Sequence, residues 1–452
     1  MIFDAMLFET KKGYYVYDVY NNSLIKVSED FFRSLQNVEE TRVDKKEFIE
    51  RYCEENKIRN ITISAPKESI VNPFSEYYIE SVLKNNLSML VLSLTDKCNL
   101  NCIYCCYHYK FQITQKSMPW EIAKKAIDVF LANSRLRNKI HIGFYGGEAL
   151  LEFELLKKCV SYIKQNVCGT EVTFGITTNG TLLNSTEIKS FLQDNDFDVL
   201  LSLDGPARIN DRYRISKAGN PTHSIVINNL KQWYLEEPDY VTKRISINAV
   251  LAPTNSKKLL DDYLMNFPVR VEITPLEKTE YFNQSIDNTM LSALKSISKE
   301  EYQYSEKFEN AQIEEYKYIY QVSKNAKMSN VHKPYIPGGA CIPGKIRIYV
   351  NSAGNIYPCE KVKETEENRI GNVDKGLDYK KIYTIFNDFV SKVDAGCGCC
   401  WVRKICKFCY KDIDNIDCDR QQESIRKKFI YYIENCYMND PNIQKILMRI
   451  VE

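Results

Sequence analysis

Residues 98–107 read CNLNCIYCCY, and this stretch places four cysteines within nine residues. Three kinds of structure use cysteines at such density: a disulfide knot, a zinc site and an iron–sulfur cluster. The chain has 452 residues, of which 44% are hydrophobic, so it can bury sizeable cores without covalent cross-links. A chain of this length is expected to form two or three domains.

The N-terminal sequence argues against a secreted, disulfide-bonded protein. MIFDAMLFETKKGYY has acidic residues where a signal peptide has its basic region, and it contains no long apolar run. No stretch approaches the ~20 apolar residues of a membrane span. We therefore expect a soluble cytoplasmic protein, in which thiols stay reduced and clustered cysteines usually bind metal. A net charge of +2 gives no reason to expect binding to nucleic acid or a membrane, and only 4 histidines disfavour a mixed Cys/His zinc protein.

The first 80 residues are predicted to form a small α+β module. Strands are expected at residues 14–20 and 24–27, joined by a turn at Asn21-Asn22. A helix then begins at the cap Ser28, and a second amphipathic helix is expected over 44–57. This pattern is compatible with a winged-helix-like unit.

From residue 88 to residue 276 the pattern alternates between apolar strands and amphipathic helices. Strands are predicted at residues 89–95, 139–145, 171–178, 197–204, 244–251 and 269–275, with helical stretches between them. Buried-type strands in βα repeats indicate a parallel sheet. Six repeats fall short of the eight of a closed barrel, so we predict an α/β fold with a partial (β/α)6 barrel, whose ligands gather at the carboxyl ends of the strands.

The remainder of the chain has a different composition. Residues 277–335 are rich in Tyr, Lys and Glu and are predicted to form a helical bridging region. Residues 336–452 are rich in Gly and Cys and end in helices, so they are predicted to form a separate cysteine-rich domain.

The spacing Cys98-x3-Cys102-x2-Cys105 follows the first predicted barrel strand. Three thiolates leave one corner of a cubane cluster without a protein ligand, and that open iron can bind an exogenous chelator. The alternative is a zinc ion with Cys106 as fourth ligand. Adjacent cysteines rarely chelate one tetrahedral ion together, and zinc sites prefer paired CxxC units.

The CxxxCxxC motif after the first strand of a βα barrel resembles the signature of the radical S-adenosylmethionine (SAM) superfamily. The resemblance implies that Cys98, Cys102 and Cys105 hold a catalytic 4Fe–4S cluster that binds SAM, and that Tyr104 packs beside the adenine. Further family marks follow the second, third and fourth strands. The resemblance implies SAM contacts by Gly146, Gly147, Glu148, Thr177, Asn179, Ser202 and Asp204.

Two of these marks have a physical rationale of their own. An exposed glycine pair lets the backbone approach a ligand, and Glu148 can pair with an ammonium group. Residues 210–214, NDRYR, resemble the family's HDxxR stretch, although its usual His is Asn210 here. Arg214 is then the predicted partner of the SAM carboxylate.

The C-terminal cysteines resemble the SPASM extension of peptide-modifying radical SAM enzymes, which houses two auxiliary 4Fe–4S clusters. By that pattern auxiliary cluster I is bound by Cys341, Cys359 and Cys409. Auxiliary cluster II is bound by Cys397, Cys400, Cys406 and Cys418. The last spacing of the family is usually x3 and is x2 here, and a zinc ribbon is the alternative for CxxC pairs.

Auxiliary cluster I has only three predicted thiolates, because no cysteine lies between Cys341 and Cys359. Its fourth iron is then open and can bind a substrate thiolate. The alternative is a fourth ligand from elsewhere, such as Cys399 or Cys436.

The N-terminal module resembles the peptide-recognition domain of maturases for ribosomally made peptides, in which a leader peptide adds as a strand to a small sheet. The chain resembles most closely the thioether-forming maturases of Cys-rich peptides, the sactipeptide and ranthipeptide synthases. This implies SAM and three 4Fe–4S clusters as cofactors, with a Cys-rich precursor peptide and a flavodoxin- or ferredoxin-type reductant as partners. Alternatives are a carbon–carbon crosslink, oxidation to formylglycine, and an iron–sulfur peptide-binding or electron-transfer protein without SAM chemistry.

Overall fold

The fold is taken from a computed structural model, and the chain divides into two compact units. One comprises residues 1–75, 306–342 and 384–452, and the other comprises residues 76–305 and 343–383. The structure describes residues 5–19, 23–41, 70–105, 116–251, 263–264, 266–275, 336, 341–398, 400–406 and 408–435. The helix predicted over 44–57 and the region predicted to bridge residues 277–335 lie outside these ranges.

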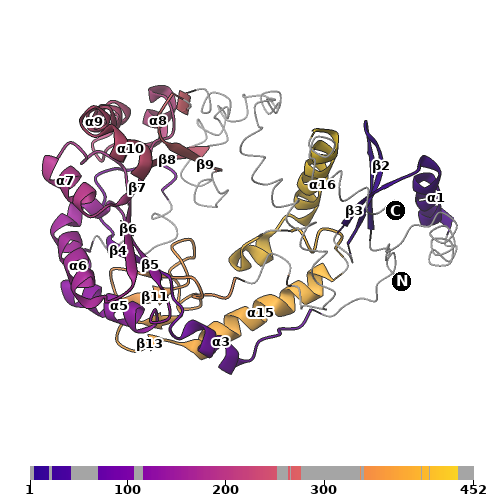
Figure 1. Ribbon diagram of the computed structural model, residues 1–452, viewed down its shortest axis with the longest axis horizontal. Helices are drawn as coiled ribbons and strands as arrows, with labels where there is room; N and C mark the ends of the chain where they lie inside the picture. The colour runs from indigo at the N-terminus through magenta and orange to yellow at the C-terminus, as the bar shows by residue number, and fades with distance from the viewer. Residues whose placement is uncertain are drawn as a thin grey trace. The chain divides into compact units, whose positions relative to one another are not determined.

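The larger unit is built on six neighbouring parallel strands (Figure 1). They are β4 Met89–Thr95, β5 Lys139–Gly146, β6 Glu171–Thr178, β7 Asp198–Ser202, β8 Ile245–Leu251 and β9 Arg270–Pro275. Each strand pairs with the next in chain order, as a βα repeat requires. The predicted α/β class and partial (β/α)6 barrel are therefore confirmed.

Helices connect these strands and lie along the outside of the sheet in Figure 1. They are α5 Trp120–Ala132, α6 Phe153–Asn166, α7 Thr186–Asp194, α8 Ala207–Tyr213, α9 His223–Glu236 and α10 Pro238–Arg244, and α3 Glu76–Leu83 precedes the first strand. The sequence pattern did not predict α8 and α10. The helix expected between β8 and β9 lies mostly outside the described residues.

The two faces of the sheet differ in chemistry because alternate residues of a strand point to opposite sides. Leu92, Phe144 and Ile176 lie side by side on β4, β5 and β6, and all three are buried on the face that the helices cover. The other face carries the pair His141 and Thr173, with His141 Nδ1 2.9 Å from Thr173 Oγ1. The inner face of the partial barrel thus presents polar and small side chains to whatever enters it.

The sheet continues beyond β4 into residues that sequence reasoning had grouped with the cysteine-rich region. Strand β10, Arg347–Val350, pairs in parallel with β4. Three short antiparallel strands follow: β11 Asn355–Tyr357, β12 Gly371–Asn372 and β13 Gly376–Leu377. The carboxyl end of β10 therefore lies at the same edge of the sheet as that of β4.

The smaller unit contains a three-stranded antiparallel sheet with helix α1, Glu29–Thr41, on one side (Figure 1). Its strands are β1 Ala5–Thr10, β2 Gly13–Asp18 and β3 Ser23–Val27. The two predicted strands and the helix are present, whereas β1 was not predicted. Ser28 caps α1 as expected, because its hydroxyl accepts the backbone N–H of Phe31 at 3.3 Å.

The opposite side of this small sheet packs on the C-terminal helix α16, Cys418–Asn435. Phe8 and Tyr17 from the sheet both lie with ring centroids 5.1 Å from Phe429, and Trp401 completes the aromatic cluster. The same unit holds most of α15, Tyr379–Cys397, and a 3₁₀ helix, Tyr410–Asn415. Among the described residues, no helix is both long and apolar enough to span a membrane.

Candidate functional site

The candidate cluster loop starts directly after β4, at the carboxyl end of the barrel sheet. Backbone hydrogen bonds fasten it to the segment that follows α8. The N–H of Asn101 donates to the carbonyl of Ile215 at 2.8 Å, and the N–H of Ile103 donates to that of Tyr213 at 3.0 Å. The loop thereby presents the three predicted cluster ligands, Cys98, Cys102 and Cys105.

Two donors point at the first of these sulfurs. The backbone N–H of Leu100 lies 3.3 Å from Cys98 Sγ, and the side-chain amide of Asn179 lies 3.8 Å from it. Burial raises the pKa of Cys98 to about 11. Burial also raises the pKa of Cys102, and the positive charge of Arg214 partly opposes that rise. Burial thus favours the protonated form of the Cys98 and Cys102 thiols, and cluster binding must displace their protons.

The glycine pair after β5 packs directly against the start of this loop. Gly146 has a φ of +138°, and a Cβ there would lie 2.5 Å from the carbonyl oxygen of Thr95. A Cβ on Gly147 would collide with the carbonyl of Lys97. Gly147 donates its N–H to the Thr95 carbonyl at 2.8 Å, so the glycines here allow a close approach between two strand ends of the chain itself.

Glu148 follows the glycines and is 1% exposed. Its Oε1 accepts from the backbone N–H of Leu150 at 3.1 Å and from the hydroxyl of Thr178 at 2.9 Å, and its Oε2 accepts the N–H of Asn179 at 2.8 Å. Burial raises the pKa of Glu148, while these hydrogen bonds act in the opposite direction. Three of the about four acceptor positions of the carboxylate are taken, so its predicted pairing with the SAM ammonium stays a prediction.

Asn179 belongs to a closed set of side-chain hydrogen bonds beneath Cys98. Its Nδ2 donates to Asn99 Oδ1 at 2.8 Å, and Asn99 Nδ2 donates to Thr181 Oγ1 at 2.8 Å. The N–H of Thr181 returns to Asn179 Oδ1 at 3.0 Å. The side chain of Asn179 is thus held in one orientation, with its amide toward the cluster loop.

Tyr104, Asp204 and Arg214 form a second, buried network under the same loop. The Tyr104 hydroxyl donates to Asp204 Oδ2 and accepts from Arg214 Nη1 at 3.0 Å. The backbone N–H of Val250 donates to Asp204 Oδ1 at 2.9 Å. Burial raises the pKa of Asp204, and the Arg214 charge and the Tyr104 hydrogen bond counter it. Three residues predicted to touch SAM separately are therefore bound to one another.

Thr177 is the last residue but one of β6, and Ser202 is the last residue of β7. Both residues are half-buried.

The stretch predicted to resemble HDxxR has an additional local function. Asp211 accepts the N–H groups of Thr222 and His223 at 2.9 and 2.7 Å, which caps the start of α9. Sequence reasoning gave no role to Asn99, Thr178 or Asp211. All three residues lie within or next to the family motifs. The sequence therefore locates them, but their hydrogen bonds appear only in the folded structure.

The four cysteines predicted to bind auxiliary cluster II lie together in the smaller unit. Burial raises the pKa of Cys397 to about 11 and that of Cys406 to about 12, and the charges of neighbouring cysteines add to both shifts. Such mutual effects mean that these thiols lie within electrostatic range of one another. The members of this set are Cys397, Cys400, Cys406 and Cys418.

The set predicted for auxiliary cluster I is described only in part. Burial raises the pKa of Cys409, and the charge of Cys341 contributes to the rise, so these two thiols are neighbours in the smaller unit. Cys359 belongs to the other unit, and its membership of this ligand set stays a prediction. The alternative ligands Cys399 and Cys436, and Cys106 beside the first site, lie outside the described residues.

The donor atoms of these sites suit iron–sulfur clusters. Within the described ranges, no three His, Cys, Asp or Glu side chains form a group that could hold a metal ion. A four-iron cubane carries its irons at separate corners, so its thiolate ligands need not converge on one point. The neighbouring side chains around the cysteine loop are also of the right kind, since Arg214 and the amide of Asn179 favour a negatively charged cluster.

Comparison with known proteins agrees with this geometry. Residues 92–234, which run from β4 into α9, match the family model of the radical SAM superfamily. This segment is a radical SAM domain. It contains the cysteine loop, the glycine turn, Asn179 and the Tyr104–Asp204–Arg214 network.

Relatives of the radical SAM domain include proteins of known and unknown activity. The chain is 38% identical over 151 residues to an uncharacterised protein of Methanocaldococcus jannaschii, a match that covers 33% of this chain and 49% of that protein. It is 33% identical over 158 residues to a serine-type anaerobic sulfatase-maturating enzyme of Bacteroides thetaiotaomicron, covering 33% of this chain and 38% of the relative. The chain thus spans half or less of the length of these relatives.

A solved structure matches over a longer stretch. The structure of anSMEcpe with bound AdoMet and Cp18Cys peptide covers 80% of this chain and 99% of its own, with a TM-score of 0.54 and 20% sequence identity. At this identity the likeness concerns the fold alone. It agrees with the α/β fold described above.

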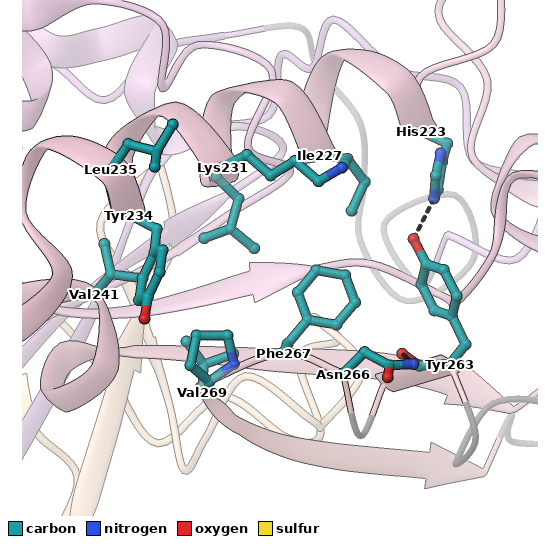
Figure 2. Close-up of a pocket in the computed structure, with 12 residues that line it drawn as sticks. His223, Ile227, Lys231, Tyr234, Leu235, Val241, Tyr263, Asn266, Phe267 and Val269 are labelled. Atoms are coloured by element: carbon teal, nitrogen blue, oxygen red, sulfur yellow. Dashed lines mark hydrogen bonds between the residues drawn. The ribbon is translucent and has the colours of Figure 1, made fainter.

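A pocket of 570 Å³ lies between α9 and the segment before β9 (Figure 2). Its walls are α9 and the segment before β9, and His223 Nε2 lies 2.7 Å from the Tyr263 hydroxyl across one end. None of the predicted ligands of the cluster or of SAM lines it. We therefore place the candidate active site at the strand ends and not in this pocket.

Proposed function

We propose that this chain uses SAM to oxidise a ribosomally made precursor peptide and joins a Cys sulfur to a carbon of another residue. The observation that carries the proposal is the cysteine loop of the radical SAM domain. Asn179 donates to its Cys98, and the hydroxyl of its Tyr104 hydrogen-bonds to Asp204 and Arg214. With cluster and SAM bound, the loop would supply an adenosyl radical able to remove a hydrogen atom from an unactivated carbon.

The protein's own part in this chemistry is to hold the loop and shield the reacting centre. The hydrogen bonds of Glu148 tie the glycine turn to the end of β6, which fixes the rim of the site on both sides of the loop. The inner face of the barrel carries polar side chains such as His141 and Thr173, which would give a peptide backbone hydrogen-bonding partners. Holding the reacting carbon and the radical in the right geometry supplies much of the rate acceleration of such a reaction.

The substrate class is inferred from the N-terminal sheet. Strand β3 pairs with β2 and is an edge strand among the residues that the structure describes, and we propose that a peptide adds at this edge. A leader peptide that adds there would gain affinity from main-chain hydrogen bonds. The sheet is rigidly supported, because α1 and α16 cover its two faces. A precursor peptide bound at β3 by its leader is therefore our proposal for the partner.

The thioether assignment rests on the three-cysteine set Cys341, Cys359 and Cys409. An open iron at auxiliary cluster I would bind the thiolate of the substrate. Forming the sulfur–carbon bond removes a proton from sulfur, a hydrogen atom from carbon and one electron, and auxiliary cluster I would accept that electron. A flavodoxin- or ferredoxin-type protein would supply the electron that starts each turnover.

Oxidation of a substrate residue to formylglycine is the second candidate, because the named relatives include anaerobic sulfatase-maturating enzymes. Those matches cover about a third of this chain, namely 33% and 32%. A match of that extent concerns SAM chemistry more than the substrate, so it leaves both candidates open to one experiment.

The deciding experiment incubates the reduced enzyme with SAM and its precursor peptide under anaerobic conditions. A thioether product is lighter by two hydrogens per crosslink, keeps its sulfur and has lost alkylatable thiols. Conversion of Cys to formylglycine removes the sulfur from the peptide. A carbon–carbon crosslink leaves every thiol open to alkylation. A protein that only binds peptide or transfers electrons forms no 5′-deoxyadenosine.

A further inference from the structure

We propose that Asn179 is a positioning residue that raises the reduction potential of the cluster bound by Cys98, Cys102 and Cys105. It would act by donating a side-chain N–H to the Cys98 sulfur. The inference rests on the proposed function, since it requires a cluster at these cysteines. It gives Asn179 a role toward the cluster itself, in addition to the SAM contact that the family resemblance implies.

The contact that motivates this role is direct. Asn179 Nδ2 lies 3.8 Å from Cys98 Sγ, and Asn179 as a whole residue is 6% exposed. The same nitrogen donates to Asn99 Oδ1 at 2.8 Å, so both of its hydrogens have acceptors, one of them the sulfur. The amide oxygen is turned the other way, because it accepts the N–H of Thr181.

The backbone of Asn179 is anchored as firmly as its side chain. Glu148 Oε2 accepts its N–H at 2.8 Å, and Glu148 Oε1 holds the hydroxyl of the preceding Thr178 at 2.9 Å. Glu148 itself is buried at the end of β5. The donor therefore comes from a rigid strand end, so it is oriented before any cluster binds.

An N–H that points at a cluster sulfur stabilises the state with more negative charge. Reduction adds an electron to the cluster, so such donors raise its reduction potential. The second donor at Cys98 is the backbone N–H of Leu100 at 3.3 Å, which every substitution except that by proline retains. Asn179 is thus the donor at this sulfur that mutation can test.

The test is a redox titration of the anaerobic full-length protein, followed by electron paramagnetic resonance. Asn179→Ala removes the donor, and Asn179→Asp keeps the shape but replaces the donor with an oxygen. We expect the signal of the Cys98 cluster to shift to lower potential in both variants, so that the reduced fraction at a fixed potential falls severalfold. The signals of the auxiliary clusters should not move.

Two controls separate this effect from general disturbance. Asn166→Ala removes an exposed amide at the end of α6 and should leave every potential unchanged. Thr181→Val removes the hydroxyl that donates to Asn179 Oδ1 but leaves the side-chain N–H of Asn179 in place. It should therefore shift the potential less than Asn179→Ala. Unchanged potentials in both Asn179 variants would contradict the inference. Loss of the cluster from both variants would also contradict it, because Asn179 would then have only a structural role. Absence of the cluster from the wild-type protein instead overturns the proposed function.

Discussion

The carboxylate of Glu148 accepts the backbone N–H of Asn179 at 2.8 Å and thereby joins the carboxyl ends of β5 and β6. This bond links the glycine turn to the residue that contacts Cys98. Glu148 and Asn179 stand about thirty positions apart in the sequence. Glu148 thus acts on the Cys98 sulfur through Asn179. The arrangement makes the rim of the radical SAM site a connected structure whose parts can be tested singly.

Glu148→Gln should weaken this rim. The amide keeps the shape of the side chain but turns an NH2 group toward backbone donors, which costs about 1–3 kcal/mol when the group is buried. We expect faster hydrogen exchange at residues 146–150 and 178–181 and a lower yield of 5′-deoxyadenosine. Glu187→Gln is the matched control, because the Glu187 side chain is 68% exposed and pairs with Lys157 at the surface. Equal exchange in the two variants would contradict the structural role of Glu148.

Tyr104→Phe separates the ring of Tyr104 from its hydroxyl. The ring remains available to pack beside a nucleotide, but Asp204 and Arg214 lose the group that bridges them. A hydrogen bond to a buried charge contributes about 1.5–3 kcal/mol, so the thermal midpoint of the larger unit should fall. Cleavage of SAM should fall with it, measured as 5′-deoxyadenosine per cluster. A wild-type yield of 5′-deoxyadenosine from Tyr104→Phe would show that only the ring matters. Tyr234→Phe, on the exposed side of α9, serves as the control.

Cys406→Ser tests auxiliary cluster II. Cys406 is buried beside Cys397, Cys400 and Cys418, so its loss should remove one cluster while the others remain. Iron and sulfide analysis should show about a third less of each, because the protein is predicted to carry three similar clusters. Cys168→Ser is the control, since that thiol is exposed in a loop. Equal iron content in the two variants would exclude Cys406 as a ligand.

Phe429→Ala should destabilise the N-terminal sheet and the Cys400–Cys406 segment together. Phe429 is buried and stacks on Phe8 with ring centroids 5.1 Å apart, so truncation leaves a cavity that costs about 3–5 kcal/mol. Hydrogen exchange at residues 5–19 and 400–406 should rise in parallel. Phe174→Ala creates a similar cavity in the barrel sheet and should spare both segments. Independent exchange of the two segments in Phe429→Ala would disprove their shared core.

The sequence was sufficient to predict the barrel because its signals are local. Each of the six strands is an apolar run, and each is followed by a helical period within the range that one βα repeat requires. The strands therefore appear within one or two residues of their predicted bounds. Strand β1 was overlooked because AMLFET offers little alternation, and its partner β2 supplies the register only in the folded sheet.

Long-range pairing explains most of what could not be predicted. The run RIYV at 347–350 looks like a strand, but its place beside β4 joins segments more than two hundred residues apart, and no local pattern encodes that pairing. The same holds for the site. Its residue types could be predicted from motifs, whereas the contact of Asn179 with Cys98 depends on how two strand ends meet.

Cleavage of SAM by the anaerobically reconstituted protein tests the central claim most directly. The wild-type protein, reduced with dithionite and given SAM, should form 5′-deoxyadenosine and methionine, whereas Cys102→Ser should form neither and still keep its auxiliary clusters. Absence of 5′-deoxyadenosine from a wild-type protein that is fully loaded with iron, or its unchanged formation by Cys102→Ser, would contradict a SAM-cleaving cluster in this loop.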